Sequence, residues 1–141
     1  MQQRSPAQKC AVFLGVLLLA AGIAGFFYNG TFTSNEHVHD DLLGLFAVNG
    51  WSNTMYIVLG IWGLASAGTW VGGRTFGYAA GLFLCGIAVW GFILGSGESI
   101  LSIVPASTAN SVAWLVLGII AVVSAVSTSP EPAPTTLAAS S

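Results

Sequence analysis

The chain is dominated by four long apolar stretches that are separated by shorter polar connections. About 20 consecutive apolar residues are needed to cross the roughly 30 Å hydrocarbon core of a bilayer as a helix. The predicted spans are residues 11–28, 52–71, 76–94 and 109–126. We therefore expect an all-α membrane protein with four transmembrane helices arranged as two antiparallel hairpins.

The connection between spans two and three is short and polar. The sequence Gly72-Gly73-Arg74-Thr75 is interpreted as a tight turn, because paired glycines favour turns. A turn of this length joins antiparallel neighbours, so spans two and three are expected to form one hairpin.

The connection before span two is longer and contains a second periodic segment. Asp40 and Asp41 precede apolar residues with helical spacing, and acidic residues favour the first turn of a helix. We expect a short interfacial helix over residues 40–50 that leads into span two.

The rest of the chain is too short for a second domain with its own core. We expect an N-terminal segment over residues 1–10, a transmembrane domain over 11–127 and a disordered tail over 128–141. The tail is rich in Pro and small residues and too poor in large apolar groups to order itself.

Composition supports the membrane assignment and excludes an ordinary soluble domain. The chain is 55% hydrophobic and only 6% charged, whereas soluble domains contain about 25% charged residues. The net charge of −2 leaves no basic surface for phosphate backbones, so nucleic acid is not an expected partner. Membrane lipids are the expected surroundings of the four spans.

The three cationic residues predict the orientation of the chain. Arg4, Lys9 and Arg74 all fall on one side when four spans are threaded through the bilayer. Positive residues collect on the cytoplasmic side of membrane proteins, so both termini are expected to be cytoplasmic.

The first span also has a competing interpretation as a secretory signal. Arg4 and Lys9 precede the apolar run, and Ala20-Ala21-Gly22 resembles a cleavage site. The length of the run and the anchor Phe26-Phe27-Tyr28 favour an uncleaved helix.

Small residues recur at helical spacing within the spans. Apolar side chains gain little by leaving lipid for each other, so close backbone approach at small residues has to support helix packing. The expected packing positions are Gly60, Gly63, Gly77, Gly81, Gly91, Gly95 and Gly118. Packing within one chain is the simpler interpretation, and a homo-oligomer or larger membrane complex is the alternative.

The spans contain no Asp, Glu, Arg, Lys or His. Pumps and coupled transporters usually carry such residues inside the bilayer, where they bind ions or relay protons. Nucleotide fingerprints and hydrolase triads are also absent from the sequence, so neither an enzyme nor a cofactor is expected. The one cluster with metal-binding chemistry is weak, because two histidines without a distant third ligand do not define a site. Its residues are His37, His39, Asp40 and Asp41.

A second group of polar and aromatic residues lies at one level near the external ends of spans two and four. Its members are Asn53, Tyr56, Asn110 and Trp114. They are candidates for binding a small apolar or lipidic molecule between the helical hairpins, and for the two asparagines a helix cap or an interhelical hydrogen bond is an adequate alternative role.

The two halves of the chain contain similar segments. Val58-Leu59-Gly60-Ile61 aligns with Val116-Leu117-Gly118-Ile119 at an offset of 58 residues. Segments after Gly22 and Gly86 also correspond, at a slightly different offset. This pattern fits an internal duplication that would give a pseudo-symmetric bundle, and chance similarity between apolar stretches is the alternative.

At these residues the sequence resembles a family of small four-helix membrane proteins, found chiefly in high-GC Gram-positive bacteria and catalogued as a domain of unknown function. The resemblance covers about residues 10–127 and is carried by several short motifs. They are Leu42-Leu43-Gly44-Leu45-Phe46, Asn53 with Leu59-Gly60-Ile61, Arg74 with Tyr78, and Leu115-Val116-Leu117-Gly118. The resemblance implies the fold and a bacterial plasma membrane, and it implies no activity.

The family pattern has histidines where this chain has other residues. Span two of the family opens with His-Asn-x-x-His and span four with Asp-Asn-x-x-His. The corresponding segments here are Ser52-Asn53-x-x-Tyr56 and Asn110-Ser111-x-x-Trp114. No family role of imidazole therefore carries over to these positions.

From the sequence we predict an integral membrane protein that acts as a non-catalytic structural or accessory component. The alternative is a binder or conductor of a small apolar or lipidic molecule between the hairpins.

Overall fold

A computed structural model describes residues 3–32, 40–131 and 133 of the chain. The described part is mostly helical and contains four helices and two short β-hairpins. The helices are α1 (Pro6–Tyr28), α2 (Gly50–Ser66), α3 (Trp70–Leu94) and α4 (Thr108–Ser127). The hairpins are formed by β1 (Asp40–Leu42) with β2 (Phe46–Val48) and by β3 (Ser99–Ile100) with β4 (Val104–Pro105).

Each helix begins at a polar residue that caps its first turn. Ser5 and Gln8 bond reciprocally at the start of α1, and Asn49 and Ser52 do the same at the start of α2. Thr69 caps α3 by accepting from the Gly72 N–H. These bonds satisfy N–H groups that a helix leaves without partners, which explains why several helices begin before the apolar runs do.

The predicted interfacial helix over residues 40–50 is wrong, because this segment contains the β1–β2 hairpin. Three residues, Leu43–Leu45, connect its strands, and the first two, Leu43 and Gly44, have φ values of 56° and 69°. Two consecutive positive φ angles match the tight turn that joins antiparallel strands. The spacing of the leucines, which predicts a helix, instead reflects strands and a turn that place Leu43 and Leu45 at the surface.

The predicted turn at Gly72-Gly73-Arg74-Thr75 is also wrong, since these residues lie inside the first turns of α3. The connection from α2 to α3 is Ala67, Gly68 and Thr69. Gly73 is needed for a different reason: a Cβ there would lie 2.9 Å from the backbone nitrogen of Gln8. Gly73 therefore serves a close crossing of α3 with α1.

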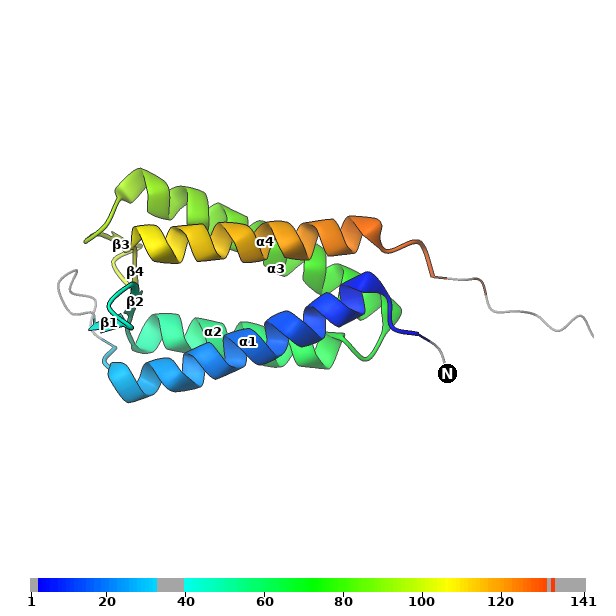
Figure 1. Cartoon of the computed structure of the whole chain (residues 1–141), viewed down its shortest axis with the longest axis horizontal. Coiled ribbons are helices and arrows are strands. Elements are labelled where there is room, and N and C mark those ends of the chain that lie inside the picture. Colours follow the sequence, from blue (N-terminus) through cyan, green and yellow to red (C-terminus); the bar gives the residue numbers. More distant parts are fainter. Residues whose placement is uncertain (1–2, 33–39, 132, 134–141) are drawn as a thin grey trace, which may run out of the picture.

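The helices pack most extensively as two pairs, α1 with α2 and α3 with α4 (Figure 1). The α2 and α3 helices follow each other directly but share a smaller contact. Both β-hairpins lie at one end of the molecule, which we call the hairpin end. Residues near both chain termini lie at the opposite end, which we call the terminal end.

The start of the predicted disordered tail belongs to the folded part. Thr128 is buried, and its hydroxyl accepts a hydrogen bond of 2.9 Å from the Ala7 N–H. Residue 132 and residues 134–141 lie outside the described part of the chain.

The two helix pairs repeat each other residue by residue. A Cβ on Gly15 would lie 3.0 Å from the Gly60 carbonyl oxygen, and one on Gly60 would lie 2.9 Å from the Gly15 oxygen. Gly81 and Gly118 have the same mutual contact, at 2.9 and 2.8 Å. Gly81 follows Gly15 by 66 residues and Gly118 follows Gly60 by 58, so α3 matches α1 and α4 matches α2.

The β-hairpins obey the same 58-residue offset. Leu101 and Ser102 turn the second hairpin with φ values of 53° and 59°, at the positions equivalent to Leu43 and Gly44. The structure therefore has two copies of one unit, each a helix, a hairpin and a second helix. The alignment of residues 58–61 with 116–119 is part of this repeat.

Six of the seven glycines expected at packing positions lie against another helix. They are Gly60, Gly63, Gly77, Gly81, Gly91 and Gly118. Gly95 has a different role, because no atom lies within 4 Å of where its Cβ would be. It ends α3 with a φ of 83°, a conformation that glycine adopts without strain.

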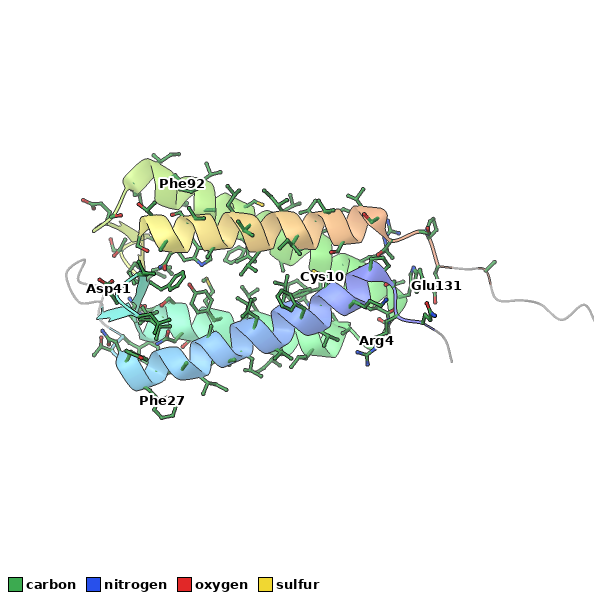
Figure 2. All side chains as sticks on the ribbon, viewed as in Figure 1. Arg4, Cys10, Phe27, Asp41, Phe92 and Glu131 are labelled. Carbon is green, nitrogen blue, oxygen red and sulfur yellow. The ribbon has the colours of Figure 1, made fainter. Side chains whose placement is uncertain are left out.

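Large apolar side chains cover the outside of the bundle, while its interior combines small and polar residues with a few large side chains such as Leu14, Phe76 and Leu84. Phe27 and Phe92, for example, extend outward from α1 and α3 (Figure 2). Three helices, α1, α3 and α4, are long and apolar enough to cross a membrane.

The glycine contacts generate the first prediction. Gly118→Ala places a methyl group 2.8 Å from the Gly81 carbonyl oxygen, so α3 and α4 must separate. We expect the free energy of unfolding in detergent to fall by about 1–3 kcal/mol. Gly86→Ala is the matched control, because its Cβ would enter open space on α3. Equal destabilisation by both substitutions would contradict the packing argument.

Candidate functional site at the hairpin end

The polar residues singled out from the sequence lie together inside the hairpin end, where α2 and α4 begin. Asn53, Asn110 and Trp114 are at most 1% exposed, and Tyr56 is 9% exposed. All four point into the bundle rather than toward its outer surface. They form, with their neighbours, a buried polar cluster at the hairpin end.

Tyr56 and Trp114 join the two repeat units directly. The Trp114 indole N–H donates a hydrogen bond of 2.9 Å to the Tyr56 hydroxyl oxygen. The two residues are 58 apart and therefore occupy equivalent positions on α2 and α4. A bond between equivalent residues lies at the pseudo-twofold axis that relates the two units.

The two asparagines connect the helices to the preceding loops. The Asn53 side-chain amide donates to the Asn29 carbonyl oxygen at 2.8 Å, just after α1 ends. The Asn110 amide donates to the carbonyl oxygens of Ala47 at 2.8 Å and Pro105 at 3.2 Å. Because Ala47 and Pro105 belong to different hairpins, Asn110 holds both β-hairpins on top of the bundle.

Each unit also donates one hydrogen bond to the β-hairpin of the other unit. The Asn49 amide donates to the Ile103 carbonyl oxygen at 2.7 Å. The Ser107 hydroxyl donates to the Leu45 carbonyl oxygen at 3.3 Å. Asn49 and Ser107 are equivalent N-cap residues, and each reaches the hairpin of the other unit.

Two buried oxygens in the cluster face glycines instead of N–H or O–H donors. Asn53 Oδ1 and Ser111 Oγ have no conventional hydrogen-bond partner. A Cβ on Gly25 would collide with Asn53 Oδ1, and one on Gly91 would collide with Ser111 Oγ. The oxygens therefore lie against the two glycine Cα atoms, where weak Cα–H···O contacts contribute at helix interfaces. Gly25 and Gly91 are equivalent positions, so this contact is also repeated.

The hydrogen bonds of the cluster have a structural role, because they hold helices and hairpins together. Its asparagine amides donate to main-chain oxygens and its indole donates to the Tyr56 hydroxyl, and no carboxylate or imidazole of the described residues belongs to it. The arrangement fixes both hairpins and both helix pairs in one geometry.

An apolar groove lies beside this cluster, between α2 and α3. It has a volume of about 420 Å³ and opens on the side of the bundle. Its lining includes Trp51, Met55, Phe83, Ile87, Trp90 and Ile100. The four residues predicted to bind a small molecule are thus packed against one another in the interior. The open groove at the same level is lined by other residues.

The weak metal candidates are not assembled into a site by the described structure. His37 and His39 lie outside the described residues. Asp40 begins β1, and Asp41 follows it as an exposed residue. Among the described residues, no group of three or more His, Cys, Asp or Glu side chains is close enough to hold a metal ion.

Sequence reasoning missed Asn29, Asn49 and Ser107, which complete the cluster. A signal for two of them was present, because Asn49-x-x-Ser52 has the spacing of a capping box and Ser107 lies 58 residues after Asn49. Asn29 lacks such a signal, since its role depends on where α1 ends relative to Asn53.

The bond at the axis generates the second prediction. Tyr56→Phe leaves the buried Trp114 indole N–H without its acceptor. We expect the free energy of unfolding to fall by about 0.5–2 kcal/mol, the range for interhelical bonds in membranes and for buried unpaired donors. The Trp114 indole N–H resonance should shift upfield in NMR spectra of the labelled protein.

Tyr28→Phe is the control, because the Tyr28 side chain is 53% exposed at the end of α1. An unchanged Trp114 resonance in Tyr56→Phe would show that the bond does not form.

Comparison with known proteins identifies the family of this chain. No curated protein and no solved structure matches it. One family model, described as a domain of unknown function (DUF4383), matches residues 8–127. The match includes nearly all of the four helices and both hairpins, as the resemblance in the sequence predicts. The chain therefore belongs to the DUF4383 family, a domain of unknown function.

Proposed function

We propose that the protein is an integral membrane protein in which all four helices cross the bilayer, and that it acts as a non-catalytic structural or accessory component. The observation that carries the proposal is the distribution of side chains. Large apolar residues face outward on every helix, and polar side chains in the interior form hydrogen bonds between the two units.

The length and composition of α2 support its assignment as the fourth membrane span, although it is the shortest of the four helices. Its 17 residues extend for about 26 Å at the helical rise, close to the thickness of the hydrocarbon core. It contains no charged residue and packs along α1. Val58 and Ile61 are 58% and 56% exposed, so a bilayer around α1 would also cover α2.

The positions of the chain ends support an even number of crossings. The described residues near the N-terminus and those after α4 lie at the same end of the bundle (Figure 1). Three crossings would place them on opposite sides of a membrane, and four place them on one side.

The charges support an orientation with the terminal end in the cytoplasm. Arg4, Lys9 and Arg74 all belong to the terminal end, whereas Asp41 and Glu98 belong to the hairpin end. Under the positive-inside rule both termini are cytoplasmic. We propose the plasma membrane of a bacterium as the location, on the basis of the family resemblance.

The accessory role follows from what the buried cluster does. Its hydrogen bonds rigidify the interface of the two units, which leaves the outer faces as the surfaces for contact with a partner or a second copy. In lipid such contacts depend on shape and small residues rather than on charge.

The third prediction tests the four crossings. Single cysteines are placed at exposed positions in a chain with Cys10→Ser and Cys85→Ser, and intact cells are treated with a membrane-impermeant maleimide. We expect labelling at Leu45→Cys and Glu98→Cys, and protection at Gly68→Cys and Ser129→Cys until the cells are opened. The two groups lie at opposite ends of the helices.

Labelling of Gly68→Cys together with Leu45→Cys from outside would show that α2 does not cross. Since Gly68 follows α2 and Leu45 precedes it, this pair of positions tests the fourth span alone.

A second candidate function is supported by the apolar groove between α2 and α3. A space of about 420 Å³ with an apolar lining fits a small apolar or lipidic molecule. Its position between the two units matches the expected place for such a ligand, although Trp51 and Met55 line it instead of the buried polar cluster.

The fourth prediction separates the two functions by affinity purification from mildly solubilised membranes. The accessory role predicts a membrane protein partner, or a second copy, in stoichiometric amount. A stoichiometric apolar molecule without protein would favour the binder. It should then be lost in Met55→Trp, which fills the groove, and kept in Ile93→Trp, which points away at 78% exposure. An isolated monomer would contradict both functions.

A further inference from the structure

We infer that the terminal end binds one phospholipid headgroup that carries both a phosphate and a primary ammonium group, at a pocket formed by α3 and the segment after α4. The pocket has a volume of about 270 Å³. Its lining is Trp70, Val71, Arg74, Thr75, Tyr78 and Glu131. The inference rests on the proposed function, because it requires the helices to lie in a bilayer.

Arg74 supplies the phosphate-binding group. Its guanidinium lies 5.9 Å from the centre of the Tyr78 ring, and its Nε is buried without a hydrogen-bond partner among the described residues. A guanidinium binds phosphate through several charge-assisted hydrogen bonds. Because Nε is closed off from solvent, a headgroup phosphate would accept from the part of the Arg74 side chain that lines the pocket.

The repeat shows that the fold does not require a cation at this position. Gln8 occupies the equivalent position in the first unit, where its amide donates to the Ala67 carbonyl oxygen at 3.1 Å. Gln8 is buried, whereas Arg74 is partly exposed and lines the pocket. The second unit thus departs from the repeat by placing a cation at a cavity.

Glu131 supplies a carboxylate to the lining of the same pocket. The Trp70 indole N–H donates to the Ser129 carbonyl oxygen at 2.9 Å, which holds the segment after α4 against α3. Glu131 follows two residues later and is seen at the terminal end in Figure 2. A primary ammonium can donate to this carboxylate, and the rings of Trp70 and Tyr78 also attract a cation.

The position of the pocket suits a lipid. Trp and Tyr are enriched at the membrane interface, where an apolar ring meets a polar headgroup region. Val71 is 62% exposed next to the pocket, at the start of the apolar face of α3. The headgroup would therefore lie between Arg74 and Glu131 while the acyl chains follow α3 into the bilayer.

The fifth prediction uses native mass spectrometry of the full chain in mild detergent. Dioleoyl phosphatidylethanolamine, phosphatidylcholine and phosphatidylglycerol are added in turn at equal concentration. We expect one phosphatidylethanolamine to be retained at least about fivefold more than either other lipid, because only it offers both groups in hydrogen-bonding form. Phosphatidylcholine cannot donate from its ammonium, and phosphatidylglycerol has none.

Variants assign the retained lipid to the pocket. Arg74→Gln should lower phosphatidylethanolamine retention about fivefold, and Glu131→Gln should remove the preference over phosphatidylglycerol. Lys9→Gln is the control, since Lys9 is an exposed cation on α1 that does not line this pocket. Circular dichroism checks that each variant is folded, and the comparison of lipids on the unaltered chain decides the question even if Arg74→Gln is not.

Three results would overturn the inference: equal retention of the three lipids, equal effects of Arg74→Gln and Lys9→Gln, or displacement of the lipid by inorganic phosphate at millimolar concentration. The last result would identify a site for free phosphate. If the mass-spectrometry experiment fails and the maleimide experiment shows four crossings, only the lipid site is ruled out. Failure of the crossings would instead remove the proposed function, whatever lipid is retained.

Discussion

The structure depends on backbone contact between helices at glycine. In a bilayer the hydrophobic effect does not drive helices together, so contact has to come from close packing and from hydrogen bonds in a medium without water. Gly15 with Gly60 and Gly81 with Gly118 allow this contact in each helix pair. Once the backbones are this close, the polar side chains of the cluster come within reach of their main-chain acceptors.

The two units agree in their backbone packing and differ in individual side chains. Glycine contacts, N-caps and hairpin turns recur at fixed offsets along the chain. Gln8 and Arg74 occupy one equivalent position, yet one is tied into the bundle and the other lines a pocket. Differences of this kind point to function more directly than the shared residues, which the fold itself requires.

The helices were predictable from the sequence, because apolar stretches of 18 to 20 residues with few polar interruptions have few alternatives. The hairpins were not, since Leu42, Leu43 and Leu45 fit a helical period and the positive φ values at Leu43 and Leu101 have no signature in those residue types. The turn predicted at Gly72 was wrong for a related reason. A glycine pair can indicate a close backbone approach as well as a turn, and only the contact of Gly73 with Gln8 shows that the close approach applies here.

The candidate site was partly predictable. Tyr56, Trp114 and the two asparagines could be placed at one level from their distance to the helix starts, but whether they faced a cavity or each other depended on how the units pack. The bond between Tyr56 and Trp114 has a further meaning. Two identical chains related by a twofold axis must bring the same residue to both sides of that axis, and two indoles can only donate. A single chain that contains both units escapes this restriction, so it can place a donor opposite an acceptor and thereby fix which half faces which.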